Sequence, residues 1–170
     1  PQSEIIFLSV QTPAQPNGEP DTRYLKVAAE SLGEHMNGFK IIVNKSTVPV
    51  GTAAKLEKAI RSKTSGSFDV VSNPEFLREG VAVDDFMKPD RIVIGTQSEQ
   101  AKKLMTELYA PYVRQGNPII FMDERSAELT KYAANSFLAT KISFMNEIAN
   151  LCELLGADVD AVRKGIGSDE

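Results

Sequence analysis

Short apolar runs alternate with amphipathic segments along most of this chain. The apolar runs have the length of strands, and they occupy residues 5–10, 41–43, 70–71, 92–94 and 119–121. Between them, apolar residues recur at helical spacing over residues 22–36, after Thr52 and after Thr96. Short strands without polar alternation are typical of a parallel sheet that is covered on both faces. The pattern therefore predicts an α/β fold with a mostly parallel sheet flanked by helices.

The longest predicted helix lies near the end of the chain. Residues 123–155 contain neither Pro nor Gly, and apolar residues recur every three to five positions. Asp123 is a suitable N-cap for this helix, and Gly156 is expected to end it. A continuous helix of this length would be roughly 50 Å long, which exceeds the diameter of a small domain. We therefore expect a second domain or a second subunit to cover its apolar side.

Composition narrows the possible partners. The 170 residues are 42% hydrophobic and 25% charged, and the net charge of −4 is not gathered in blocks, so a nucleic-acid surface is not indicated. One Cys and one His exclude an internal disulfide and a thiolate-rich or His-rich metal site. No apolar run approaches the roughly 18 residues of a membrane span. We expect a cytoplasmic protein that binds no metal, no nucleic acid and no membrane. Because the chain begins without Met, we also expect it to be part of a longer protein.

Three loops follow predicted strands, at the sheet edge where open α/β sheets bind ligands. They are residues 10–13, 45–52 and 72–80. In the third loop, Asn73 before a proline predicts a helical turn that would place Glu75 and Glu79 on one face. The two carboxylates either complement a helix dipole, or act as a general base (Glu75) and an acceptor for a ligand hydroxyl (Glu79). Taken alone, the spacing favours the first interpretation.

Lys131 and Asn135 form a second polar pair, four residues apart on the long helix. They are either a snorkelling lysine, with its ammonium solvated, beside a capping or bridging asparagine, or two donors that stabilise a developing oxyanion. Spacing alone favours the solvated lysine. Cys152 lies in the middle of the same helix with no cation adjacent in sequence, which predicts a buried structural thiol. A G-x-G-x-x-G phosphate-binding fingerprint is missing from the chain, whose only G-x-G is residues 165–167.

Four strings, in this order along the chain, closely resemble the UDP-glucose/GDP-mannose dehydrogenase family. They are STVPVGT (residues 46–52), SNPEFLREG (72–80), PDRIVIG (89–95) and AELTKYAANSFLATKISFMNEIANLCE (127–153). The resemblance covers essentially the whole chain and is nearer to the UDP-glucose branch. It implies a partial Rossmann-like fold, in which residues 1–122 are the C-terminal part of the NAD-binding domain. Residues 123–170 would then be the long central helix and the start of the dimerisation region.

The resemblance also implies a reaction. Members of this family oxidise an alcohol of a nucleotide sugar to a carboxylate by two successive hydride transfers to NAD, through a thioester on a cysteine. In the UDP-glucose branch this reaction converts UDP-glucose to UDP-glucuronate. Matching positions assign the catalytic roles to Glu75 as general base of thioester hydrolysis, to Lys131 and Asn135 as the pair on the C6 oxygen of the sugar, and to Thr47 as the residue that positions water. The implied cofactor contacts are Val10, Thr12, Pro13, Ser46, Thr47, Val48 and Glu79. The implied substrate contacts are Glu75, Phe76, Leu77, Arg78, Glu79, Lys131 and Asn135.

Two parts of the family pattern lie outside these 170 residues, namely the glycine-rich cofactor fingerprint and the nucleophilic cysteine. Cys152 matches a structural position instead. We therefore expect the chain by itself to be inactive, and the protein that contains it to form a homodimer through the long helix. Two alternatives stay open: a dehydrogenase of another nucleotide sugar, of the GDP-mannose or UDP-N-acetylhexosamine type, and a non-catalytic dimerisation module.

Overall fold

The computed structural model describes residues 3–113 and 116–168. The chain divides into two compact units, Pro1–Lys131 and Tyr132–Glu170. The long helix α5 (Glu124–Leu155) belongs to both, because it begins in unit 1 and continues through unit 2. Its 32 residues form one unbroken helix, as the sequence predicts.

Unit 1 is built on a sheet of five strands that lie side by side in chain order. The three pairs β1–β2, β2–β3 and β4–β5 are parallel, whereas β3 and β4 are antiparallel and meet only at Ser72 and Gly95. This confirms the prediction of a mostly parallel sheet. The strands are β1 (Ile5–Leu8), β2 (Lys40–Asn44), β3 (Phe68–Ser72), β4 (Ile92–Gly95) and β5 (Ile119–Met122).

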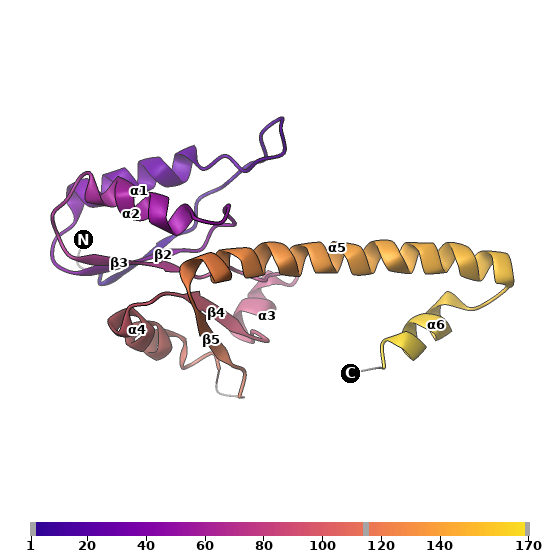
Figure 1. Ribbon diagram of the computed structural model, residues 1–170. Coiled ribbons are helices and arrows are strands. Elements are labelled where there is room, and N and C mark those ends of the chain that lie inside the picture. Colours follow the sequence, from indigo (N-terminus) through magenta and orange to yellow (C-terminus); the bar gives the residue numbers. More distant parts are fainter. Residues whose placement is uncertain (1–2, 114–115, 169–170) are drawn as a thin grey trace. The chain divides into compact units, whose positions relative to one another are not determined.

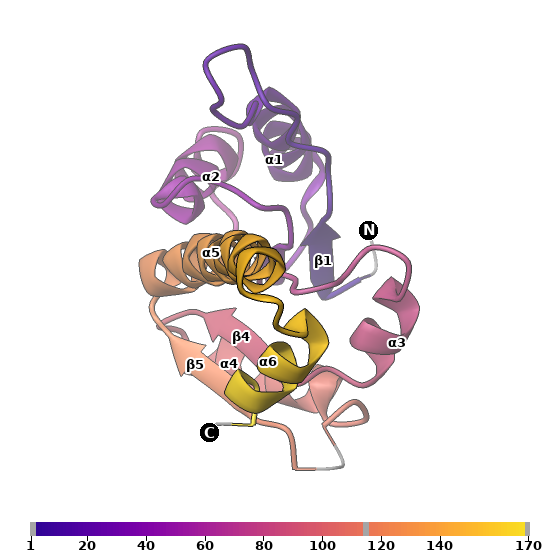
Figure 2. The same cartoon turned by 90° about the vertical axis from the view of Figure 1, so that its right-hand side faces the viewer.

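Helices cover both faces of this sheet (Figures 1 and 2). On one face lie α1 (Arg23–His35) and α2 (Thr52–Arg61), and on the other lies α4 (Glu99–Tyr109). Neighbouring residues of β2 point to opposite faces, so Ile42 joins the core under α1 and α2 while Ile41 joins the core under α4. Both isoleucines are fully buried, which explains why β2 reads as a continuous apolar run.

The helix α3 (Ala82–Met87) was not predicted from the sequence. It has six residues and no buried side chain. A helix this short is little more than one turn and a half, so it offers no apolar periodicity to detect.

Unit 2 contains the rest of α5 and the short helix α6 (Val159–Ile166). Asp158 caps α6, since its carboxylate accepts the backbone N–H of Asp160 at 2.9 Å. Cys152 is buried, as predicted. Within the described residues, no helix is long and apolar enough to cross a membrane.

Candidate functional site

Lys131 and Glu75 form the central contact of the candidate site. Lys131 lies near the start of α5, and its Nζ donates to Glu75 Oε1 at 3.0 Å. The lysine side chain is 8% exposed and that of Glu75 is 30% exposed. A charge that is buried this far needs a partner, because desolvation penalises an unpaired ion. Lys131 is therefore a buried, paired ammonium, and the interpretation as a solvated surface lysine is wrong.

The loop that carries Glu75 is not helical. Residues 73–78 have no regular structure, so the predicted helical turn after Asn73 is wrong, and so is the shared helix face for Glu75 and Glu79. Glu75 bonds its own loop instead, since its Oε2 accepts the N–H of Leu77 at 2.6 Å. Glu79 is exposed and makes no hydrogen bond or ion pair with any residue that the structure describes.

Asn73 is the anchor of this loop, and it is only 1% exposed. Its Nδ2 donates to the carbonyl of Val93 on β4 at 2.8 Å, and its Oδ1 accepts the hydroxyl of Tyr109 on α4. Its backbone N–H donates to the carbonyl of Asn44 at 2.9 Å. Burial raises the pKa of Tyr109 to about 12, so this hydroxyl keeps its proton. These tertiary bonds displace the helix cap that the sequence suggested.

The first two predicted loops are bonded to each other at the carboxyl ends of β1 and β2. Ser46 Oγ donates to the carbonyl of Val10 at 2.6 Å, and Thr12 Oγ1 donates to the carbonyl of Thr47 at 3.0 Å. A cavity of about 10 Å³ lies beside this pair of loops, and Thr47 and Lys131 both line it. The structure therefore brings Thr47, Lys131 and Glu75 into one cluster.

Glu128 belongs to the same cluster, although the sequence analysis missed it. It lies one turn before Lys131 on α5 and is 3% exposed. Its carboxylate accepts the backbone N–H groups of Gly51 and Ala53, the latter at 2.7 Å, and so satisfies the first turn of α2. Gly51 adopts a φ of 90°, a left-handed conformation that favours glycine. The only sequence signal was a glutamate near Lys131, which looks like an ordinary helix-surface charge.

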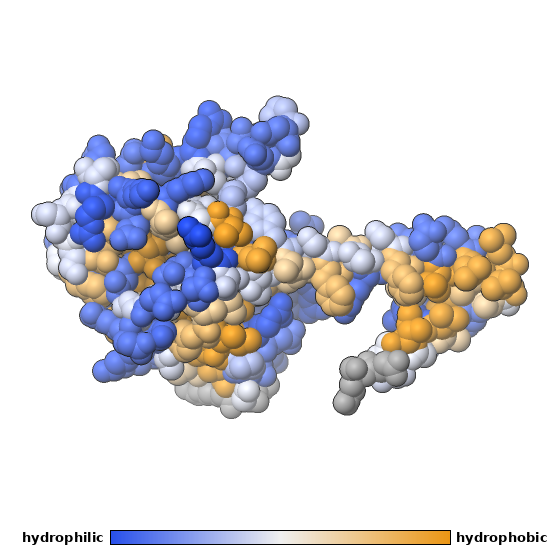
Figure 3. All heavy atoms as spheres, viewed as in Figure 1, coloured by the Kyte–Doolittle hydropathy of each residue, from blue (hydrophilic) through white to orange (hydrophobic). Residues whose placement is uncertain are grey.

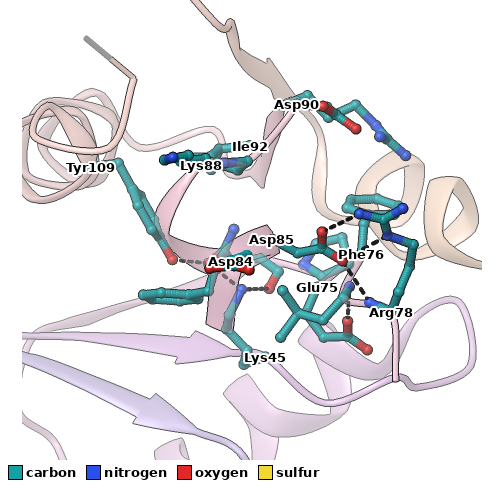
Figure 4. Close-up of a pocket in the computed structure, with 16 residues that line it drawn as sticks. Lys45, Glu75, Phe76, Arg78, Asp84, Asp85, Lys88, Asp90, Ile92 and Tyr109 are labelled. Carbon is teal, nitrogen blue, oxygen red and sulfur yellow. Dashed lines mark hydrogen bonds and ion pairs between the residues drawn. The ribbon is translucent and has the colours of Figure 1, made fainter. Parts of the chain in front are cut away.

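A larger cavity of about 510 Å³ opens beside Glu75 (Figure 4). Glu75, Phe76, Leu77 and Arg78, four of the five predicted substrate contacts in this loop, are among its lining residues. Arg91 places its guanidinium 4.1 Å from the centre of the Phe76 ring, and Lys131 Nζ lies 5.4 Å from the same point. Arg78 pairs with a neighbouring carboxylate, Asp85, at 2.6 Å.

The other predicted site residues are distributed differently. Pro13 accepts the N–H of Asp21 at 2.8 Å through its carbonyl and is itself exposed. Val48 is buried in the core under α1 and α2, and it also borders the small cavity. Asn135 lies in unit 2, one turn after Lys131 along α5. The roles assigned to these residues stay predictions.

Comparison with known proteins now decides the family. Residues 1–113 match the NAD binding domain of the UDP-glucose/GDP-mannose dehydrogenase family, and residues 125–170 match its central domain. The chain belongs to this family. It is 53% identical to the UDP-glucose 6-dehydrogenase TuaD of Bacillus subtilis over 98% of its own length, and 49% identical to the UDP-glucose 6-dehydrogenase of Pseudomonas aeruginosa over 99%. It spans only 36% and 38% of these two relatives.

Solved structures of the family have the same fold. A UDP-glucose dehydrogenase from Pyrobaculum islandicum superimposes with a TM-score of 0.91 at 42% identity, and a GDP-mannose dehydrogenase from Pseudomonas aeruginosa superimposes with 0.87 at 32% identity. Each comparison covers 98% of this chain and 39% of the solved one. The predicted partial Rossmann-like dehydrogenase fold is therefore confirmed.

Proposed function

We propose that the full-length protein containing this chain oxidises UDP-glucose to UDP-glucuronate with two equivalents of NAD. One alcohol and one water give one carboxylate, two NADH and three protons. The observation that carries the proposal is the ion pair of buried Lys131 with the partly buried Glu75 at 3.0 Å, beside the Thr47 loop. The names of relatives at 53% and 49% identity support UDP-glucose as the substrate, and the NAD binding domain supports the cofactor.

Lys131 suits the oxygen on C6 of the sugar. Its ammonium has lost most of its water and is held in place, so it can donate to an oxygen that gains negative charge without reorganising. Asn135, one helical turn further along α5, is proposed as the second donor. The hydrides leave from the carbon that carries this oxygen.

Glu75 suits the final hydrolysis. A carboxylate whose Oε1 and Oε2 are each fixed by a hydrogen bond is held in one orientation, as a general base must be. It would take a proton from the water that cleaves a thioester on a cysteine outside this chain. The cavity of about 10 Å³ at Thr47 and Lys131 has the size of one water molecule, which supports Thr47 as the residue that positions water.

NAD would be held by the loops at the carboxyl ends of β1 and β2, and it would accept the two hydrides. The described residues fit this role, because Val10, Thr12, Ser46 and Thr47 are bonded to one another at the sheet edge where α/β folds bind ligands. Pro13, Val48 and Glu79 are proposed to complete the contacts. The substrate contacts are proposed at residues 75–79, and residues 75–78 of this loop border the cavity of about 510 Å³.

We further propose that the protein is a homodimer that assembles through unit 2. Large apolar side chains of α5 are exposed, including Phe137, Ile142 and Leu151. A contiguous exposed apolar surface is typical of an interface.

We place the boundary between the NAD-binding part and the central part at residues 122 and 123, which is supported by family matches that end at 113 and resume at 125.

The direct test uses purified full-length protein with NAD and either UDP-glucose or GDP-mannose. We expect two NADH for every UDP-glucose consumed, and at least roughly 100-fold lower kcat/KM with GDP-mannose, a discrimination that a hydrogen-bonding site can supply. The chain of 170 residues is the second control, and we expect it to be inactive because it lacks the fingerprint and the nucleophile. Turnover of another nucleotide sugar, but not of UDP-glucose, would contradict the proposal.

A further inference from the structure

Lys45 is a half-buried cation to which neither the family resemblance nor the reaction above assigns a role. It directly follows β2, and its backbone N–H donates to the carbonyl of Leu8 at 2.9 Å, which fixes the residue at the end of the sheet. Its side chain enters the cavity of about 510 Å³ that Glu75 also lines (Figure 4). The backbone hydrogen bond of Lys45 therefore holds this residue beside the candidate site.

The ammonium of Lys45 contacts the anchor of the Glu75 loop. Its Nζ lies 3.3 Å from Asn73 Oδ1 and 3.4 Å from the Asn73 carbonyl oxygen. The same Oδ1 accepts the hydroxyl of Tyr109, so one buried oxygen joins β2, α4 and the loop. Because Glu75 is only two residues further along, a shift of Asn73 would move Glu75 away from Lys131.

Charge connects Lys45 to the same pair. Burial lowers the pKa of Lys45 to about 8, and the positive charge of Lys131 acts in the same direction, whereas the negative charge of Glu75 opposes both. One carboxylate thus interacts with two ammonium groups. If Glu75 were protonated or removed, the two lysines would repel each other without compensation.

Other charged and titratable groups border the cavity of about 510 Å³ and a second cavity, of about 290 Å³, that Lys45 also lines. Arg78 and Asp85 neutralise each other through their ion pair. Among the described residues, Lys45 is the cation that contacts Asn73. The remaining groups are Asp84, Lys88, Asp90, Arg91, Tyr109 and Tyr112.

We propose that Lys45 is a positioning residue for Glu75: it holds Asn73 in place and supplies a second positive charge beside the Glu75 carboxylate, which keeps that carboxylate directed at Lys131. This inference rests on the proposed function, in which Glu75 accepts a proton from water. Lys45 itself need not touch the substrate or the cofactor. Its effect is expected on hydrolysis of the thioester and not on hydride transfer.

The first test follows activity in the full-length protein. Lys45→Met should move the acidic limb of the kcat profile up by roughly one pH unit, so that kcat below the limb falls about tenfold. Lys45→Arg, which keeps the cation, should restore the limb. The initial burst of two NADH per site should survive in both variants, and KM for UDP-glucose should change less than about twofold. Lys103→Met, an exposed lysine on α4, is the matched control and should behave as wild type.

An unchanged acidic limb in Lys45→Met would overturn the inference, as would an equal shift in the arginine variant. The second test does not depend on activity. Competitive acetylation of lysines in the full-length protein, read by mass spectrometry across pH, should show Lys45 titrating at least roughly half a pH unit lower in Glu75→Gln than in wild type, with Lys103 unmoved. No shift would overturn the inference even if UDP-glucose were not the substrate, whereas an inactive wild type that shows the shift would refute only the proposed function.

Discussion

The two units of this protein treat polar and apolar surface in opposite ways. Unit 1 buries charged and amide groups, since Asn73, Glu128 and Lys131 are all buried and all hydrogen-bonded. Unit 2 exposes large apolar side chains, such as Leu154 at 83% and Phe137 at 60%, and hydrophobic residues gather over the second half of α5 and over α6 in Figure 3.

The difference agrees with the proposed roles of the two units, chemistry in unit 1 and assembly in unit 2. Buried polar groups destabilise a fold unless they are bonded, so a cluster of hydrogen-bonded ones indicates that this part of the structure is held in one geometry. Apolar groups that are exposed to water raise the free energy of the protein, and a partner that covers them lowers it. Unit 1 therefore holds its charged cluster by itself, and unit 2 carries the exposed apolar surface that we propose as the dimer interface.

The largest expected effect comes from removing the buried ammonium. Lys131→Ala in the full-length protein should lower kcat by about 10²–10³, because a donor to an oxyanion contributes more in the transition state than in the ground state. Steady-state kinetics with UDP-glucose would measure it. Lys141→Ala, on the same helix but exposed in unit 2, is the matched control and should keep kcat within about twofold. A raised KM with intact kcat would reduce Lys131 to a binding residue.

The next largest expected effect is a loss of stability when the buried carboxylate of Glu128 is removed. Glu128→Ala leaves the N–H groups of Gly51 and Ala53 without an acceptor, and we expect it to lower the free energy of unfolding by about 2–4 kcal/mol. Glu147→Ala, an exposed glutamate of α5 in unit 2, should change it by less than about 0.5 kcal/mol. Denaturant titration would measure both. Equal effects from the two substitutions would contradict the contrast between the units.

Lys45 gives a pH dependence of stability. Its pKa is about 8 in the fold against 10.5 in its absence, so between these values the unfolded chain binds more protons and stability rises with pH. Relative to Lys45→Met, the free energy of unfolding should gain roughly 2–3 kcal/mol from pH 8 to 10.5 and stay level below pH 7. The same comparison with Lys103→Met should show no gain. A level difference across the whole range would mean that Lys45 titrates as an ordinary lysine.

The smallest expected effect concerns assembly. Replacing one exposed apolar residue, Ile142→Ser, should weaken the proposed dimer about tenfold, which corresponds to about 1.4 kcal/mol. Sedimentation at micromolar concentrations would detect the shift towards monomer. Val83→Ser replaces an apolar residue of unit 1 that is even more exposed than Ile142, and it should leave the dissociation constant unchanged. A wild-type protein that stays monomeric would contradict the assembly role of unit 2.

Local pattern was sufficient to predict the sheet and the long helix. The apolar run through Ile41 and Ile42 identifies a strand covered on both faces, and the absence of Pro and Gly over residues 123–155 identifies α5. The local sequence pattern gave a wrong prediction where hydrogen bonds between residues far apart in the sequence determine the structure. Asn73 looks like a helix cap, but its partners Val93 and Tyr109 lie 20 and 36 residues away. These bonds fix an irregular loop, which no local preference encodes.

The candidate site was predictable only in part for the same reason. The resemblance drew attention to Glu75 and Lys131, yet their contact spans 56 residues and appears only in the fold. Glu128 bonds amides 75 and 77 residues away, and Lys45 bonds Asn73 at a distance of 28. Charged side chains with such distant partners cannot be told from surface charges in a sequence.

The central part of the proposed function is the role of Glu75 as the base that acts after both hydride transfers. Glu75→Gln keeps the shape and removes the basicity, so the full-length variant should release about two NADH per site in a rapid burst and then stall, with steady turnover lowered by roughly 10²–10⁴. Intact-mass analysis should detect the acyl-enzyme. Glu79→Gln should bind NAD and UDP-glucose more weakly, and no acyl-enzyme should accumulate in this variant. If Glu75→Gln gives neither burst nor adduct, the hydrolytic role of Glu75 is wrong.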